Sequence, residues 1–168
     1  TMIAELISLI IQTPGAMACL LWGPRGSAKT SMIQQIFDKL NVDLETVIAS
    51  FRDPTDFGGM PIPVEVNGQT EIKLEAPAWA KRTQRSAEKF IKKFKERVKE
   101  NTMPLISGGV FIDEASCTPP AVQAALLRVI LEKWVGEFKL DDTVKFLAAA
   151  NPPEEAAGGW DMAIPLAG

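Results

Sequence analysis

The chain has 168 residues, of which 46% are hydrophobic and 23% are charged. This composition and length are typical of a globular protein with one core, so we predict a single α/β domain over residues 1–168. The net charge of -3 gives no overall reason to expect nucleic-acid binding, and the lack of histidine excludes His-based catalytic triads and His-ligated zinc.

The cysteines and the N-terminal segment point to the cytoplasm. Cys19 and Cys117 lie far apart among apolar residues, so we interpret them as small core residues in a reducing compartment. Residues 2–11 are apolar, but they contain Glu5 and lack a basic leader and a cleavage site, which favours a docked helix over a signal peptide. No run approaches the roughly 20 apolar residues of a membrane span.

The next segments alternate between strand and helix patterns. Residues 17–22 form an apolar run typical of a strand covered on both faces. Residues 31–40 carry apolar side chains at helical spacing, and residues 46–50 indicate a second strand. Strand, helix, strand is the opening of a doubly wound, mainly parallel sheet.

The middle of the chain predicts a loop and a hairpin. Residues 51–63 are rich in Asp, Gly and Pro and predict a surface loop. Residues 62–66 and 71–74 alternate around Asn67-Gly68, a strong hairpin signal, with a loop lengthened by Gln69 and Thr70.

A long helix is predicted over residues 78–100. Its apolar stripe consists of Ala87, Phe90, Ile91, Phe94 and Val98. Nine of the chain's 18 basic residues lie between Lys81 and Lys99, against two acidic ones. The cationic face could hold nucleic acid or an acidic partner, or it could simply be solvated. Because the aromatic residues belong to the apolar stripe and do not interleave with the charges, we prefer the solvated face.

The remaining pattern completes the sheet. Residues 109–112 predict a buried strand that ends in two acidic residues, and residues 119–133 predict a helix that begins at a proline. Residues 134–140 and 143–150 predict two strands, and residues 152–168 are loop-like.

A phosphate-binding loop is predicted between the first strand and the next helix, the context that such a loop requires. Backbone N–H groups and the helix N-terminus would bind the β-phosphate of ATP, Lys29 the β- and γ-phosphates, and the Thr30 hydroxyl Mg²⁺. Ala28 stands where a final glycine is usual, and we expect it at negative φ, with Gly26 left-handed. The predicted nucleotide-binding residues are Gly23, Pro24, Arg25, Gly26, Ser27, Ala28, Lys29 and Thr30.

Two acids and an amide complete the predicted site. Asp113 and Glu114 end an apolar strand, where Asp113 would hold Mg²⁺ and Glu114 would deprotonate the attacking water. Asn151 follows the last strand and could hydrogen-bond the water or the γ-phosphate, although Asn-Pro also starts turns. Ligands of such sheets bind at the carboxyl edge.

These motifs make the chain resemble a MoxR-type AAA+ ATPase. The matching segments are 21–26, 53–61, 77–79, 113–116, 119–127, 151–153 and 165–167. The resemblance implies a three-layer P-loop sandwich with β-hairpin insertions and Asn151 as sensor 1. It also implies a ring, usually hexameric, with an arginine from the next subunit, and a remodelling chaperone that works with a von Willebrand A-domain partner.

The chain departs from this family pattern in two ways. It stops at Gly168, before the arginine-bearing segment and the helical lid, so we expect a piece of a longer protein. The basic helix is also longer than the resemblance implies.

We therefore expect a Mg-dependent ATPase that remodels a protein client, with Glu114, Lys29 and Asn151 as catalytic residues. The alternatives are a nucleotide-gated binding module that does not hydrolyse ATP, and a DNA-associated motor that uses the basic helix.

Overall fold

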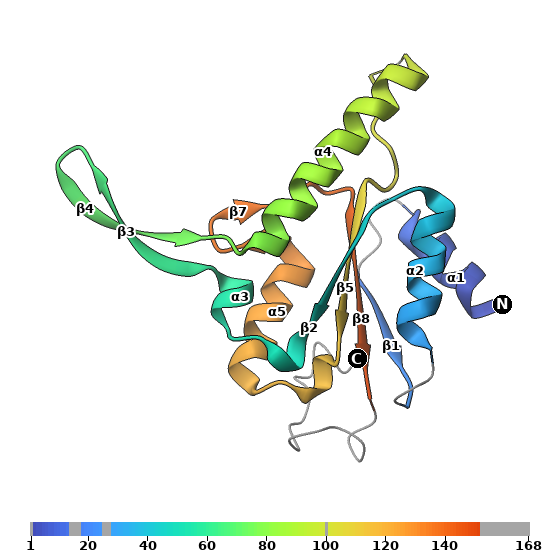
Figure 1. Cartoon of the computed structure of the whole chain (residues 1–168), viewed down its shortest axis with the longest axis horizontal. Helices are drawn as coiled ribbons and strands as arrows, with labels where there is room; N and C mark the ends of the chain where they lie inside the picture. Colours follow the sequence, from blue (N-terminus) through green and yellow to red (C-terminus); the bar gives the residue numbers. More distant parts are fainter. Residues whose placement is uncertain (1, 14–17, 25–27, 100, 152–168) are drawn as a thin grey trace.

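A parallel sheet of four strands lies at the centre of the fold (Figure 1). The computed structural model describes residues 2–13, 18–24, 28–99 and 101–151. The strand order is β1-β8-β5-β2, which confirms the predicted α/β class. The strands are β1 (Cys19–Trp22), β2 (Leu44–Ile48), β5 (Gly108–Asp113) and β8 (Val144–Ala150).

Helices cover both faces of this sheet, as Figure 1 shows. One layer consists of α1 (Met2–Ile11) and α2 (Lys29–Leu40), and the other contains α4 (Ala78–Val98) and α5 (Pro120–Glu132). The near-continuous apolar character of the central strands follows from this double cover.

The side chains of the central strands alternate between two cores. In β5, Val110 and Ile112 pack with α4 and α5, whereas Phe111 packs with α1 and α2. In β8, Phe146 packs with α4 and α5, whereas Leu147 packs with α1 and α2. Because successive strand residues point to opposite faces, one apolar run serves both cores.

The predicted surface loop over residues 51–63 is wrong in part. It contains the short helix α3 (Thr55–Gly58), which follows a 3₁₀ turn at Ala49–Phe51, and the first strand of the hairpin. Phe57 is fully buried, and its ring centroid lies 6.1 Å from that of Trp79. Trp79 Nε1 also donates a hydrogen bond to Asp56 O at 2.8 Å, so this segment fixes the start of α4.

The hairpin of β3 (Met60–Val66) and β4 (Gln69–Glu75) projects from the body of the molecule (Figure 1). Val66 pairs directly with Gln69, so the prediction that Gln69 and Thr70 lengthen the loop is wrong. Asn67 and Gly68 alone make the turn, with φ of 50° and 78°. Two left-handed residues match the strand twist of a two-residue hairpin.

The predicted strand over residues 134–140 is a small hairpin instead. Its strands are β6 (Trp134–Val135) and β7 (Phe138–Lys139), and the chain reverses at Gly136, where φ is 65°. A Cβ atom on Gly136 would lie 3.0 Å from Gly58 O, so glycine also permits close contact with α3. A 3₁₀ turn at Ala115–Cys117 links β5 to the segment before α5.

The long basic helix ends at Val98, within two residues of the predicted end. One face of its first half is buried, through Trp79, Ala80, Thr83 and Ala87, but Phe90 and Phe94 are only half-buried and Val98 is exposed. Cys19 is half-buried and Cys117 is buried, and neither belongs to a disulfide within the described residues. The predicted C-terminal loop, 152–168, lies outside the described residues.

No helix in the described part of the chain has the length and apolar character needed to cross a membrane.

Candidate nucleotide site at the carboxyl edge of the sheet

The predicted site residues meet because three strands end at one edge. Trp22 of β1 pairs with Ala150 of β8, and Ile112 of β5 pairs with Ala148, so these strands finish almost level (Figure 1). The residues that follow them are Gly23, Asn151 and Asp113-Glu114. Gly23 N donates to Ala150 O at 3.2 Å, which extends the sheet pairing by one residue into the phosphate loop.

Lys29 and Thr30 are the first two residues of α2. The half-buried Lys29 side chain places Nζ 2.7 Å from Gly23 O, 3.2 Å from Pro24 O and 3.4 Å from Asn151 Oδ1. The ammonium group thus lies between the start of the loop and the end of β8. Because Lys29 is the first residue of α2, its ammonium group also lies at the helix end where the dipole favours anions.

Thr30 and Asp113 join the two predicted motifs. Thr30 Oγ1 donates a hydrogen bond to Asp113 Oδ2 at 3.3 Å, although 83 residues separate them in the chain. The contact requires α2 and β5 to present their ends at the same edge of the sheet. A hydroxyl and a carboxylate so placed are two oxygen ligands pointing at one position.

The prediction for Ala28 is wrong. Its φ is 59° and its ψ is 25°, so the residue is left-handed at the N-cap of α2 rather than at negative φ. Met32 N donates to Ala28 O at 3.0 Å, so the carbonyl already belongs to the helix. The left-handed conformation crowds a Cβ atom, which is why glycine is usual there. Arg25, Gly26 and Ser27 lie outside the described residues.

Glu114 is held in a defined position by its own backbone and by β2. Its φ is 55°, and its N–H donates to Asp113 Oδ1 at 2.8 Å. The hydroxyl of Ser50, in the 3₁₀ turn that follows β2, donates to the Glu114 carboxylate. Sequence reasoning missed Ser50. The available signal was a hydroxyl at the end of a predicted parallel strand, which must lie at the same edge as the acids.

Asn151 is almost fully buried, with 4% of its surface exposed. Its backbone N–H donates to Ser116 Oγ at 3.1 Å, while its side-chain oxygen is the atom near Lys29. Ser116 was also missed, because nothing in the local pattern of the Asp113–Ser116 segment indicates a contact with β8. The burial and the two contacts fix the amide beside the ammonium group.

The AAA family model (ATPase family associated with various cellular activities) matches residues 19–157. The chain belongs to the AAA family of ATPases. This supports ATP binding and hydrolysis as the general activity of the AAA domain described above.

A solved structure of a candidate ATPase from Cytophaga hutchinsonii is similar to this AAA domain, with 24% sequence identity and a TM-score of 0.49. The alignment covers 90% of this chain and 38% of that one, so the AAA domain here spans well under half the length of that protein. Comparison with curated protein sequences finds no significant match.

The AAA domain contains oxygen atoms that suit Mg²⁺ as ligands. Thr30 and Asp113 supply a hydroxyl and a carboxylate oxygen 3.3 Å apart. The described residues contain no cluster of three or more His, Cys, Asp or Glu side chains that could enclose a metal alone. Magnesium in nucleotide sites takes one or two protein ligands and completes its shell with phosphate and water, so a hydroxyl and a carboxylate would suffice.

Proposed function

We propose that this chain is the ATP-hydrolysing core of a MoxR-type AAA ATPase, organised as one domain over residues 1–168, that remodels a protein client. The observation that carries this proposal is the contact between Thr30 and Asp113. It joins the end of the phosphate loop to the end of the acidic strand. A bound Mg-ATP at this edge would therefore meet both motifs.

The positions of the side chains support separate roles. Lys29, with its ammonium group between Gly23 O and Asn151 Oδ1, would bind the β- and γ-phosphates. Thr30 and Asp113 would hold Mg²⁺, which neutralises charge on the phosphates. Backbone N–H groups at the N-terminus of α2 would complete the cradle.

Glu114 would act on the attacking water. Its carboxylate follows the magnesium-binding acid by one residue and is oriented by the Ser50 hydroxyl. A carboxylate placed beside the γ-phosphate accepts a proton from water as the oxygen attacks phosphorus. Asn151, an uncharged amide, would hydrogen-bond the same water or the γ-phosphate.

Two substitutions test the proposal in the complete protein. Lys29→Ala removes a charge-assisted contact and should weaken ATP binding about tenfold or more, measured by calorimetry. Glu114→Gln should keep ATP affinity and slow phosphate release by at least about 10². Glu71→Gln, on the exposed hairpin, is the matched control. Unchanged ATP affinity in Lys29→Ala, or unchanged turnover in Glu114→Gln, would contradict the assigned roles.

We further propose ring assembly, with a hexamer as the expected size, and a von Willebrand A-domain partner. The support is the MoxR-like set of segments, above all 53–61, 77–79 and 119–127. Light scattering of the complete protein with a slowly hydrolysed ATP analogue measures the assembly directly. A protein that stays monomeric while hydrolysing ATP at full rate would contradict the ring. A protein that binds ATP but never turns it over would be the nucleotide-gated module instead.

A further inference from the structure

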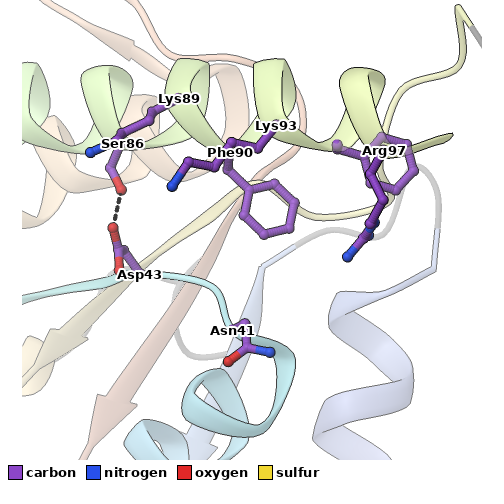
Figure 2. A pocket seen from close by; sticks show the side chains of 8 residues that line it. Asn41, Asp43, Ser86, Lys89, Phe90, Lys93 and Arg97 are labelled. Carbon is purple, nitrogen blue, oxygen red and sulfur yellow. Dashed lines mark hydrogen bonds between the residues drawn. The ribbon is translucent and has the colours of Figure 1, made fainter. Parts of the chain in front are cut away.

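A second concave site lies at the edge of the sheet opposite the nucleotide site. It is a cavity of about 410 Å³ between the last turns of α4 and the segment that leads from α2 into β2 (Figure 2). Its lining residues are Asn41, Asp43, Ser86, Lys89, Phe90, Lys93, Phe94 and Arg97. A volume of this size is in the range of small-ligand sites. We refer to it as the cationic cavity.

Three cations lie along one side of the cationic cavity. Lys89, Lys93 and Arg97 follow one another at intervals of four residues, so they form a row with steps of about 6 Å along α4. Elsewhere on this helix, Lys81 and Arg82 make ion pairs with Glu75 and Glu45. None of the three cavity cations has an ion pair within the part of the chain that the structure describes.

Aromatic side chains share the cavity with these charges. Phe90 and Phe94 are half-buried and line the same space, and the Arg97 guanidinium carbon lies 5.6 Å from the centroid of the Phe94 ring. Figure 2 shows Phe90 pointing from α4 toward Asn41. The preference for a merely solvated face assumed that aromatic residues and charges were segregated. The structure brings them together.

We propose that the cationic cavity binds single-stranded nucleic acid. A row of cations follows a phosphate backbone, and aromatic rings beside it stack on bases, which is the combination found in proteins that bind single strands without strong sequence preference. The cavity has walls on two sides, α4 and the α2–β2 segment (Figure 2). An unpaired strand can turn its bases toward the rings, whereas the bases of a duplex are already paired and stacked on one another.

The aromatic rings separate this ligand from an acidic peptide. Asp43 also lines the cavity, and its carboxylate accepts a hydrogen bond from the Ser86 hydroxyl (Figure 2). A carboxylate at this place repels phosphate and peptide carboxylate alike, so charge does not choose between the two ligands. Phe90 and Phe94 do, because bases stack on aromatic rings and the side chains of an acidic peptide do not.

The test is fluorescence anisotropy of a labelled oligodeoxycytidylate with the complete protein at several salt concentrations. Binding should weaken with salt with a logarithmic slope of about -2, the value for three cations on a single strand. The double variant Lys89→Gln/Lys93→Gln should bind at least about tenfold more weakly at low salt, with a slope near -0.7. Phe94→Leu should lose about fivefold or more with the slope unchanged, because a stacking ring is replaced by an aliphatic group.

The matched control is Lys92→Gln/Lys95→Gln, which removes the same charge from the side of α4 that does not line the cavity. All variants should keep ATP affinity, measured by calorimetry, which shows that they are folded. Equal loss of oligonucleotide binding in the two double variants would overturn the site. Equal affinity for a duplex, or displacement of the strand by polyglutamate at equal charge concentration, would overturn the choice of ligand.

Discussion

Lys29 Nζ and Asn151 Oδ1 lie 3.4 Å apart across the carboxyl edge of the sheet, although 122 residues separate them. The amide is buried and its backbone is held by Ser116, so its side chain has a fixed aim. We predict that Asn151→Ala lowers the rate of ATP hydrolysis by about 10–10², because it removes one oriented hydrogen bond from the reacting groups. ATP affinity should change by less than about threefold, since most phosphate contacts remain.

Steady-state phosphate release and calorimetric ATP binding in the complete protein separate these two effects. Asn101→Ala, an exposed asparagine far from the site, is the control. A variant that loses ATP binding and turnover in equal measure would show that Asn151 only supports the fold of the loop.

Ala28 offers a prediction about stability. Its left-handed backbone should cost about 1 kcal/mol, because a Cβ atom is crowded in this conformation. Ala28→Gly should therefore raise the free energy of unfolding by about 1 kcal/mol in urea denaturation. Ala124→Gly, on the exposed side of α5, should lower it by a similar amount, because glycine destabilises an ordinary helix interior. If both substitutions changed the free energy of unfolding in the same direction, the assigned conformation of Ala28 would be contradicted.

Gly109 and Gly108 form a matched pair in β5. A Cβ atom on Gly109 would lie 2.2 Å and 2.4 Å from Phe37 ring atoms, and Phe37 is fully buried. Gly109→Ala should destabilise the domain by about 1–3 kcal/mol, the usual cost of overpacking. On Gly108 the nearest atom would be 3.7 Å away, so Gly108→Ala should cost less than about 1 kcal/mol. If urea denaturation found the two variants equally stable, the close packing of Phe37 on Gly109 would be contradicted.

Lys133 predicts a pH dependence of stability. Burial lowers the pKa of Lys133 to about 8, helped by Lys145 and Lys139 and opposed by Asp142 and Asp141. Burial also lowers the pKa of Lys145. Because an unfolded lysine titrates near 10.5, the unfolded state binds more protons between pH 8 and 10.5. The buried charge of Lys133 therefore destabilises the fold fully below pH 8, and this destabilisation is relieved as the pH rises from 8 to 10.5.

Thermal unfolding of Lys133→Met checks this prediction. The variant should be more stable than the natural chain at pH 7, and its advantage should shrink between pH 8 and 10. Lys92→Met, on the exposed side of α4, serves as the control. An advantage for Lys133→Met that stays constant over this window would show that the charge of Lys133 is not its source.

The order of the main elements and the edge at which the site forms follow from the amino-acid pattern alone. Continuous apolar runs such as 109–112 are typical of strands covered on both faces, and the residues that follow parallel strands must lie at one edge of the sheet. This is why Lys29, Asp113 and Asn151 could be named before their distances were known. The hairpin around Asn67-Gly68 was also predicted, because its turn is a local property of two residues, but its loop was predicted too long by Gln69 and Thr70.

Which distant groups face each other depends on how the elements pack in three dimensions. The contacts of Ser50 with Glu114 and of Ser116 with Asn151 depend on strand order and register, which no local pattern contains. The burial of Phe57 in a segment rich in Asp, Gly and Pro depends on Trp79 packing against it. Phe94 and Lys93 share a cavity because α4 runs past the end of the sheet. The sheet does not bury the apolar stripe of α4 there, so the stripe forms one wall of an open site.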